Sequence, residues 1–224
     1  MSKISYFAAL VVSLVLLNTQ AVFAQNPASY YEEVPRTFFG GLILGGNFTQ
    51  VDGDRFAGYH KVGLNAGGIM YVNLADHLAA SIEILFSQKG SRAHKAQPSA
   101  DNSFVITKYN INLNYAEVPI QLNYFDRRKS HFGAGFSISR LISSKEDAQT
   151  TQVVVPDFTP YPFRKMDYNF VAGGSLHLVK GLFLGIRFQY SLRSIRDKAN
   201  EPPGFAGRSE QFNNLWTLRL MYLF

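Results

Sequence analysis

The chain has 224 residues, of which 46% are hydrophobic, 14% aromatic and 17% charged, and its formal net charge is +6 at pH 7. Soluble proteins usually carry more charge, about a quarter of their residues, whereas a mean hydropathy near zero is too low for a helical membrane protein. The aromatic content excludes a disordered chain, and the lack of cysteine excludes a disulfide scaffold. The composition therefore predicts an ordered chain whose apolar residues are evenly diluted by polar ones.

The N-terminus has the pattern of a secretory signal peptide. Lys3 precedes an apolar run over residues 6–17, and Val22-Phe23-Ala24 places a small residue at the cleavage position. Cleavage after Ala24 gives three parts: a signal peptide over residues 1–24, a periplasmic N-terminal segment over 25–35, and a β-barrel domain over 36–224. The alternative is an uncleaved anchor helix, but the apolar run is short for a span of roughly 20 residues.

The rest of the chain alternates apolar and polar residues with period two, which indicates strands with one apolar and one polar face. The longest uninterrupted example is Gly181 to Ile195, where leucine, isoleucine and aromatic residues occupy every even position between Leu182 and Leu192. In chain order, the eight predicted strands are Phe38–Gln50, Lys61–Asn73, His77–Lys89, Thr107–Phe125, His131–Ser143, Asp167–Val179, Gly181–Ile195 and Trp216–Phe224.

The fourth predicted strand, Thr107 to Phe125, is irregular. Its apolar residues are odd-numbered up to Tyr115 and even-numbered from Val118 onwards, so the phase of the alternation changes once. One extra residue in a strand has this effect, so we predict a β-bulge near Ala116-Glu117 that keeps both apolar faces on the same side. Two shorter strands joined by a tight turn are the alternative, although these two residues lack turn chemistry.

Short and long connections alternate strictly between the predicted strands. The short ones span residues 73–76, 126–129 and 179–181, and the long ones span 51–60, 90–106, 144–164 and 196–213. This pattern predicts an all-β fold, an eight-stranded antiparallel transmembrane β-barrel of the up-and-down type, with both termini on the periplasmic side. In lipid the barrel must close, because every backbone polar group needs a partner. A soluble lipocalin-type barrel is the alternative, but the polar faces contain few of the Lys and Glu residues typical of a solvated surface.

Several motifs resemble one known family. They are Gly45-Gly46-Asn47, Glu83-Ile84-Leu85-Phe86-Ser87-Gln88-Lys89-Gly90, Tyr115-Ala116-Glu117-Val118-Pro119-Ile120 with Leu122-Asn123-Tyr124, and the terminal Leu220-Met221-Tyr222-Leu223-Phe224. Together they are similar to the outer-membrane β-barrel family of Bacteroidetes often labelled PorT-like. The resemblance covers essentially all of the chain after the signal peptide. It implies the fold and an outer-membrane location, and it implies a role in type IX secretion only for the member that gave the label.

The parity of the strands places a polar network inside the barrel. Glu83, Glu117, Arg187 and Arg219 are expected to face a lumen that, with eight strands, is only wide enough for side chains. Since an unpaired charge there would be costly, we predict a plugged lumen in which these charges pair. Catalysis by the carboxylates is the alternative. The same parity places further polar residues inward: Asn65, Asn112, Asn114, Gln121 and His177.

Basic residues near the strand ends on the long-loop side are expected to contact lipopolysaccharide phosphates: Lys89, Arg92, Arg193 and Arg196. A solvated rim is the alternative for them. The five histidines are scattered singly without metal-ligand spacing, and no nucleotide or nucleophile motif is present. We therefore predict no catalytic residues, no metal, no cofactor and no nucleic-acid partner.

The sequence thus predicts an integral protein of the Gram-negative outer membrane with a structural, surface-interaction or secretion-accessory role and no enzymatic activity. The expected partners are outer-membrane lipids and lipopolysaccharide, the barrel-assembly machinery through the final strand ending in Phe224, and a secretion or surface protein. Two other functions remain open. One is an outer-membrane lipid-modifying enzyme, and the other is a narrow channel for small solutes.

Overall fold

The computed structural model describes residues 37–56, 58–93, 95–151, 157–207 and 209–224, so the predicted signal peptide and the segment over 25–35 lie outside the described residues. Among the described residues, no helix is long and apolar enough to cross a membrane. The strands are β1 (Phe38–Asp52), β2 (Lys61–Ala75), β3 (Leu78–Arg92), β4 (Gln97–Pro98), β5 (Val105–Phe125), β6 (His131–Thr150), β7 (Met166–Val179), β8 (Leu182–Ser191) and β9 (Phe212–Leu223), with a short 3-10 helix, η3, at Lys198–Asn200.

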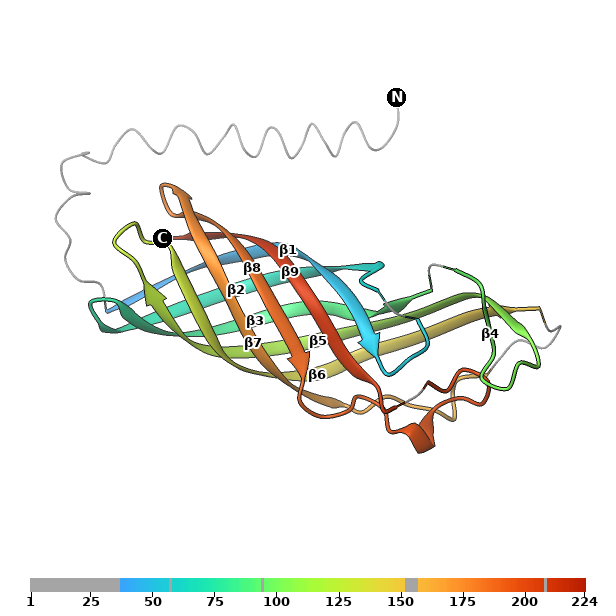
Figure 1. Ribbon diagram of the computed structural model, residues 1–224. Coiled ribbons are helices and arrows are strands. Elements are labelled where there is room, and N and C mark those ends of the chain that lie inside the picture. The colour runs from blue at the N-terminus through green and yellow to red at the C-terminus, as the bar shows by residue number, and fades with distance from the viewer. Residues whose placement is uncertain (1–36, 57, 94, 152–156, 208) are drawn as a thin grey trace, which may run out of the picture. The chain divides into compact units, whose positions relative to one another are not determined.

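Eight of these strands form a closed antiparallel ring. The order is β3-β2-β1-β9-β8-β7-β6-β5, and β3 also pairs with β5, which closes the sheet; the two-residue β4 is an addition at the edge of β5. The first and last strands of the ring pair over twelve positions, from Gly41↔Leu223 to Asp52↔Phe212. Figure 1 shows the strands winding obliquely around a common axis. The predicted eight-stranded up-and-down barrel is confirmed.

The alternation of side chains separates an apolar outer wall from a polar interior. On β1, Leu42 and Leu44 are 64% and 62% exposed, whereas Ile43 between them is 3% exposed. The same contrast holds on β9, where Trp216 and Leu218 point outward and Thr217 is buried. Because a strand turns alternate side chains to opposite faces, one sequence pattern builds both surfaces.

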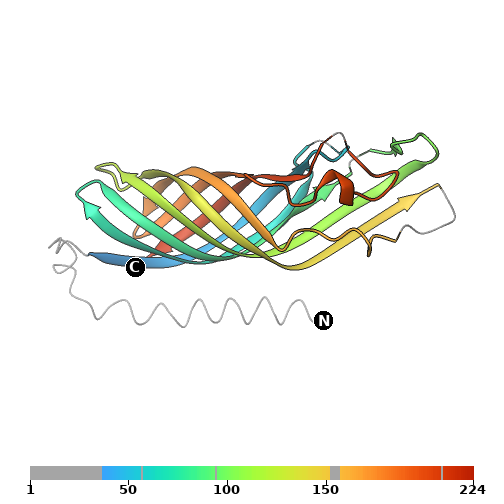
Figure 2. The ribbon, with the colours of Figure 1, turned by 90° about the horizontal axis from the view of Figure 1, so that it is seen from below.

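The two ends of the barrel differ in how the chain reverses. At one end, called here the turn end, the strands are joined by the short segments Asp76-His77, Asp126–Ser130 and Lys180-Gly181. The long connections gather at the opposite end, called here the loop end, where β5 and β6 extend beyond the other strands (Figures 1 and 2). The connection predicted over 144–164 accordingly begins as strand, because β6 continues to Thr150.

The predicted β-bulge at Ala116-Glu117 is wrong. The pairing of β5 with β3 runs without a shift from Leu78↔Tyr124 to Arg92↔Asn110. Tyr109, Ile111, Leu113 and Tyr115 are therefore buried on the same face as Glu117. What changes along β5 is the character of the interior, which is polar beside Glu117 and apolar nearer the loop end. The register shift in this region lies on β6, since Asn114 pairs with Ser143 and Tyr115 pairs with Leu141.

This arrangement also corrects the predicted orientation of Asn112 and Asn114. Both alternate with the buried residues of β5 and lie on its outer face, half-buried, instead of in the lumen. Asn112 accepts a hydrogen bond from Lys61, and Asn114 donates one to Ser143 at 2.8 Å. By contrast, Asn65 and Gln121 are buried on the inner face, 3% and 5% exposed.

The orientation of β5 can be tested with two neighbouring substitutions. Leu113→Ala removes a fully buried side chain from the loop end and should destabilise packing there by about 2–5 kcal/mol, the usual range for such truncations. Asn114→Ala, on the outer face, should have little effect. The measurement is the rate of limited trypsin cleavage in the long loops of the folded protein. A bulged strand would give the opposite ranking, with Asn114→Ala the more damaging change.

Candidate functional site

The interior of the barrel holds a buried ionic cluster contributed by β3, β8 and β9. Arg187 Nη2 lies 2.5 Å from Glu83 Oε1, and Arg219 Nη1 lies 3.0 Å from Glu83 Oε2. Gln121 Nε2 donates to the same carboxylate at 3.3 Å. Glu83 is 1% exposed and the two arginines are 2% and 6% exposed. One carboxylate therefore serves two guanidinium groups, leaving one positive charge to be balanced elsewhere in the lumen.

Inward-facing glycines allow close approach of the strands that carry these arginines. A Cβ at Gly45 would lie 2.7 Å from Arg219 Cβ and 2.5 Å from the Leu218 carbonyl oxygen. At Gly173 it would lie 2.9 Å from Arg187 Cα. Neither approach is tolerated by a real side chain, so the glycines on the inner faces of β1 and β7 are needed where the backbones of β9 and β8 come this close.

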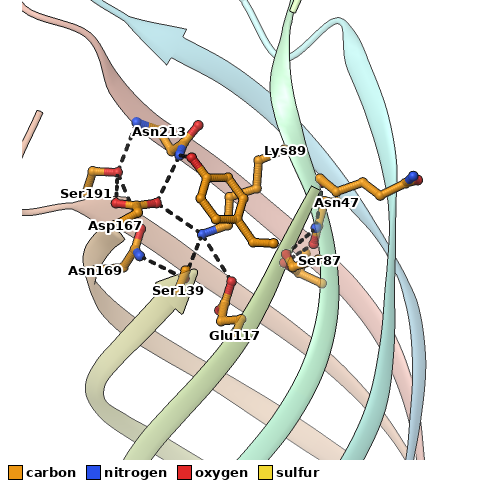
Figure 3. Close-up of polar contacts among 12 residues, drawn as sticks. Asn47, Ser87, Lys89, Glu117, Ser139, Asp167, Asn169, Ser191 and Asn213 are labelled. Atoms are coloured by element: carbon orange, nitrogen blue, oxygen red, sulfur yellow. Dashed lines mark hydrogen bonds and ion pairs between the residues drawn. The ribbon is translucent and has the colours of Figure 1, made fainter. Parts of the chain in front are cut away.

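A second ionic cluster lies nearer the loop end and contains Lys89, Glu117 and Asp167 (Figure 3). Lys89 Nζ is 3.0 Å from Glu117 Oε2 and 3.4 Å from Asp167 Oδ2, and all three side chains are fully buried. Asp167 also accepts hydrogen bonds from Ser191 Oγ at 2.8 Å and Asn213 Nδ2 at 2.9 Å. This cluster carries one excess negative charge, so the two clusters together are neutral.

Side-chain hydrogen bonds complete the wall where β2 and β3 separate. Their backbone pairing ends at Asn65↔Ser87. Beyond it, Asn47 Nδ2 donates to Ser87 Oγ and to the Gln88 carbonyl oxygen, each at 3.0 Å, and the Leu64 amide donates to Gln88 Oε1 at 3.0 Å. Thr217 Oγ1 donates to Asn47 Oδ1 at 2.8 Å, which ties this region to β9. The amide side chains thus satisfy backbone groups that no neighbouring strand reaches.

Apolar clusters lie on both sides of the polar interior. The turn-end cluster consists of Ile43, Ile69, Tyr71, Ala79, Leu85, Phe183 and Met221, with Phe39, Phe125 and Leu223 packed against it. Within it, Tyr71 stacks on Phe39 at 4.8 Å between ring centroids. The loop-end cluster, called here the cap, consists of Val51, Phe56, Ile106, Tyr109, Ile111, Leu113, Tyr115, Phe163, Ile195 and Phe205. The cap joins the ends of β1 and β5 to residues from three long connections.

Buried charges also hold the cap together. Arg196 Nη2 is 2.5 Å from Glu146 Oε2, and its guanidinium carbon lies 3.6 Å from the centroid of the Phe163 ring. The Tyr109 hydroxyl donates to Glu146 as well. A more exposed pair, Arg164 and Asp197, connects two loops at 2.5 Å. Arg196 is 1% exposed, so it is a structural residue of the cap.

Two carboxyl groups in the long loops, those of Asp54 and Glu201, have raised pKa values. Burial, aided by the nearby charges of Asp52 and Glu201, raises the pKa of Asp54 to about 7, although hydrogen bonds from Ser91 and the Phe56 amide oppose the shift. Burial likewise raises the pKa of Glu201, whose Oε2 accepts a hydrogen bond from the Gly207 amide at 2.6 Å. Glu201 Oε1 is buried without a hydrogen-bond partner among the described residues.

Only some of the site residues predicted from the sequence lie together in the structure. It brings together Glu83, Arg187 and Arg219, while Glu117 pairs with Lys89 instead. Lys89 is fully buried, so the predicted lipopolysaccharide contact is wrong for it. The predicted lipopolysaccharide contact is also wrong for Arg196, which is 1% exposed. Arg92 and Arg193 are exposed near the strand ends, and His177 lies on the inner parity of β7 near the turn end, 5.0 Å from the Phe183 ring.

Two lumen residues were missed by the sequence analysis, although both carried a signal. Lys89 has the same odd parity as Glu83 on one strand, and Asp167 has the parity of the buried Asn169. Position near a strand end was given more weight than parity, which is why Lys89 was assigned to the rim.

The described residues form neither a metal-ligand group nor a Ser-His-Asp triad around Asp167. Among the described residues, no group of three or more His, Asp or Glu side chains could hold a metal ion. The buried Ser191–Asp167 pair lies at the level of Ser139 on β6, whereas the buried His131 is eight positions away on that strand, roughly 26 Å at the usual rise. These three residues therefore cannot act together.

A closed barrel with an apolar wall and an ion-paired interior defines an integral outer-membrane β-barrel protein. A sequence model of the family described as "Outer membrane protein beta-barrel domain" matches residues 23–197, and the chain belongs to this family, which indicates an outer-membrane location. In this class the loop end faces the cell exterior and the turn end faces the periplasm. No curated protein matches the chain.

Two solved barrels are similar in fold. One is Ail, the attachment invasion locus protein of Yersinia pestis, in complex with the heparin analogue sucrose octasulfate; identity is 11%, the match covers 84% of this chain and 99% of Ail, and the TM-score is 0.42. The other is the outer membrane protein AlkL in lipid bilayers, at 14% identity, with 83% of this chain and 90% of AlkL covered and a TM-score of 0.34.

Removing the Glu83 carboxylate, which pairs with both Arg187 and Arg219, should destabilise the barrel. Glu83→Ala leaves two buried guanidinium groups without their carboxylate, and breaking a buried pair in this way typically costs about 3–5 kcal/mol. The folded barrel can be followed on a gel by comparing the migration of unheated and heated samples. The urea concentration at which the folded form is lost should be lower for Glu83→Ala than for the wild type. Replacing Glu83 and Arg187 together by Met keeps the two lumen clusters neutral overall and should recover part of the loss. Equal urea resistance of Glu83→Ala and Glu210→Ala, a control in an exposed loop position, would contradict the network.

The raised pKa of Asp54 predicts that the cap loosens as pH rises. Because the folded loop holds this proton more tightly than an unfolded one, the stability that the proton provides is fully present below about pH 4 and is lost as pH rises towards about 7. After correction for intrinsic rates, amide hydrogen exchange around residues 53–56 and 201–207 should be faster at pH 8 than at pH 5. Asp54→Asn should reduce this difference, and Glu201, whose pKa is also raised, should account for what remains.

Asp101→Asn provides the matched control. Hydrogen bonds from Ser99 and Ser103 lower the pKa of Asp101, an exposed loop residue, to about 2, so it is ionised throughout this range. If Asp54→Asn retained the pH dependence shown by the wild type and by Asp101→Asn, another group would be responsible.

Proposed function

We propose that this protein is a non-conducting outer-membrane barrel that carries an ordered extracellular cap as a surface for interaction with another macromolecule, and that it performs no catalysis. The observation that supports this most directly is the neutral set of buried charges inside the barrel, enclosed between two apolar clusters. A wide pore would instead keep its lumen charges hydrated.

The energetics favour a closed lumen. Eight strands leave an interior filled by side chains, and here the charged ones are almost fully buried and paired. Opening a path for solutes would separate these pairs in a narrow space of low dielectric, where an isolated charge is costly. The aromatic turn-end cluster adds a second barrier on the periplasmic side.

The cap favours a surface-interaction role. Its loops are held by their own apolar cluster and by the buried Arg196–Glu146 pair. In addition, β7 pairs with β6 only as far as Arg140↔Met166, so the upper part of β6, residues 142–150, has no strand on that side among the described residues. An unpaired strand edge can accept an extended segment from another protein.

The secretion-accessory role of PorT-like barrels in Bacteroidetes is a narrower version of this proposal, and it rests on the sequence motifs. The motif residues converge inside the barrel: Asn47 bonds Ser87 at 3.0 Å, and Lys89 pairs with Glu117 at 3.0 Å. Residues that fill the lumen support a shared barrel architecture more strongly than a shared partner. The secretion role therefore needs its own test, in which deletion of the gene should reduce export of surface proteins.

The proposal also includes contacts with lipopolysaccharide and with the barrel-assembly machinery. Arg92 and Arg193 are exposed near the loop-end strand termini, where lipopolysaccharide phosphates would lie. Phe224 is 67% exposed, and its amide donates to the Gly40 carbonyl at 2.9 Å, so the end of the final strand lies beside β1. This edge would be presented to the barrel-assembly machinery before the ring closes.

Planar-bilayer recording tests the closed lumen. The purified wild-type protein should show no discrete conductance steps, because every path crosses the paired charges. The double variant Lys89→Ala, Glu117→Ala removes two filling side chains and serves as the sensitised comparison, in which brief openings are expected. Stable unitary conductance from the wild-type protein would overturn the proposal in favour of a channel.

A further inference from the structure

A hollow lies in the outer wall of the barrel near the turn end. Its volume is about 470 Å³, and it is lined mainly by apolar side chains from β6 to β9, among them Phe132, Leu176, Ile186 and Leu218. The pairing register places four residues in one row across the wall: Phe132, Gly174, Ile186 and Leu218. Gly174 is the member of this row without a side chain, and it forms the floor of the hollow.

The hollow exists because Gly174 is a glycine, although the backbone does not require one there. A Cβ at this position would have ordinary contacts, 3.6 Å from the His131 carbonyl oxygen and 3.9 Å from Phe132 Cβ. By contrast, the inward neighbour Gly173 has no room for a side chain beside Arg187. The wall faces lipid, so an acyl chain is the natural group to fill an apolar hollow at this position and to restore the missing contacts.

Positive charge gathers beside the hollow at its periplasmic end. The β5–β6 turn contributes Asp126 and Ser130 to the lining, and the three residues between them, Arg127, Arg128 and Lys129, are all exposed. Asp126 Oδ1 accepts a hydrogen bond from the Arg128 amide at 2.8 Å, which fixes the turn that presents these cations.

The neighbouring β7–β8 turn adds to this charge. Its Lys180 is exposed, and the end of β7 that leads into this turn is connected to the β5–β6 turn, because the His177 amide donates to Ser130 Oγ at 3.2 Å. The remaining turn at this end carries Asp76 and His77 instead. The basic charge is therefore concentrated on the side of the barrel that has the hollow.

We propose that this part of the wall binds one glycerophospholipid of the periplasmic leaflet, with an acyl chain in the hollow over Gly174 and its phosphate facing Arg127, Arg128 and Lys129. The excess of cations over the single carboxylate of Asp126 gives preference to a headgroup with net negative charge. The site lies at the turn end, so it takes a phospholipid and not the lipopolysaccharide of the opposite leaflet. This site is separate from the cap and the lumen and extends the proposed function.

Native mass spectrometry of the detergent-purified full-length protein, titrated with phosphatidylglycerol, tests the site. The wild type should retain one molecule more tightly than the others. Gly174→Leu fills the hollow and should weaken this retention about tenfold, as expected if burial of roughly two methylene groups is lost. Gly68→Leu is the matched control, because Gly68 also faces outward and its Cβ would lie 3.6 Å from the Gly41 carbonyl oxygen.

The headgroup contact is tested separately. The triple variant Arg127→Ala, Arg128→Ala, Lys129→Ala changes only exposed turn residues, so its folding should be unaffected, and it should remove the preference for phosphatidylglycerol over phosphatidylcholine. Equal retention by Gly174→Leu and Gly68→Leu, with both folded as judged by heat-modifiable migration, would overturn the site. Stronger retention of lipopolysaccharide than of phosphatidylglycerol would overturn its assignment to the periplasmic leaflet.

Discussion

Charge balance in a narrow lumen is the constraint on which the rest of this structure depends. A barrel in lipid must close so that every backbone group is paired, and closing eight strands leaves space only for side chains. Among the described residues, the two lumen clusters centred on Glu83 and Lys89 contain six ionised side chains whose charges balance. The inward glycines Gly45 and Gly173 pair with Arg219 and Arg187 across neighbouring strands, where a Cβ would meet the adjacent backbone.

The interior changes character along the axis, and this change links the membrane part to the cap. Nearer the turn end it is aromatic, in the middle it is ionic, and towards the loop end it becomes apolar again around Ile111 and Leu113. The apolar upper section lets the long loops pack against β5 as a small core. The cap therefore combines a rigid support with carboxyl groups, Asp54 and Glu201, whose raised pKa values keep part of it sensitive to pH.

The alternation of residues was sufficient to predict the ring of strands, because lipid imposes the same rule on every strand. It was misleading on β5, where Tyr109, Ile111, Leu113 and Tyr115 are apolar but buried on the inner face. The rule that apolar residues face lipid fails for these four side chains. It therefore predicts a bulge that is absent from β5 and an inward orientation for Asn112 and Asn114, which lie on the outer face. Lys89 and Arg196 lie near strand ends, where basic residues are expected on the rim, but each is buried by an ion pair with a residue far away in the sequence, Glu117 for Lys89 and Glu146 for Arg196.

Chemical accessibility of the lumen tests the central claim most directly, and the cysteine-free sequence makes it clean. Thr217 faces the lumen and is 2% exposed, whereas Arg127 is in an exposed turn. Single variants Thr217→Cys and Arg127→Cys would be treated in bilayers with a membrane-impermeant maleimide supplied to both sides. A sealed, ion-paired lumen predicts complete modification of Arg127→Cys and none of Thr217→Cys. Modification of Thr217→Cys at a comparable rate would show a hydrated path through the barrel and would contradict the account.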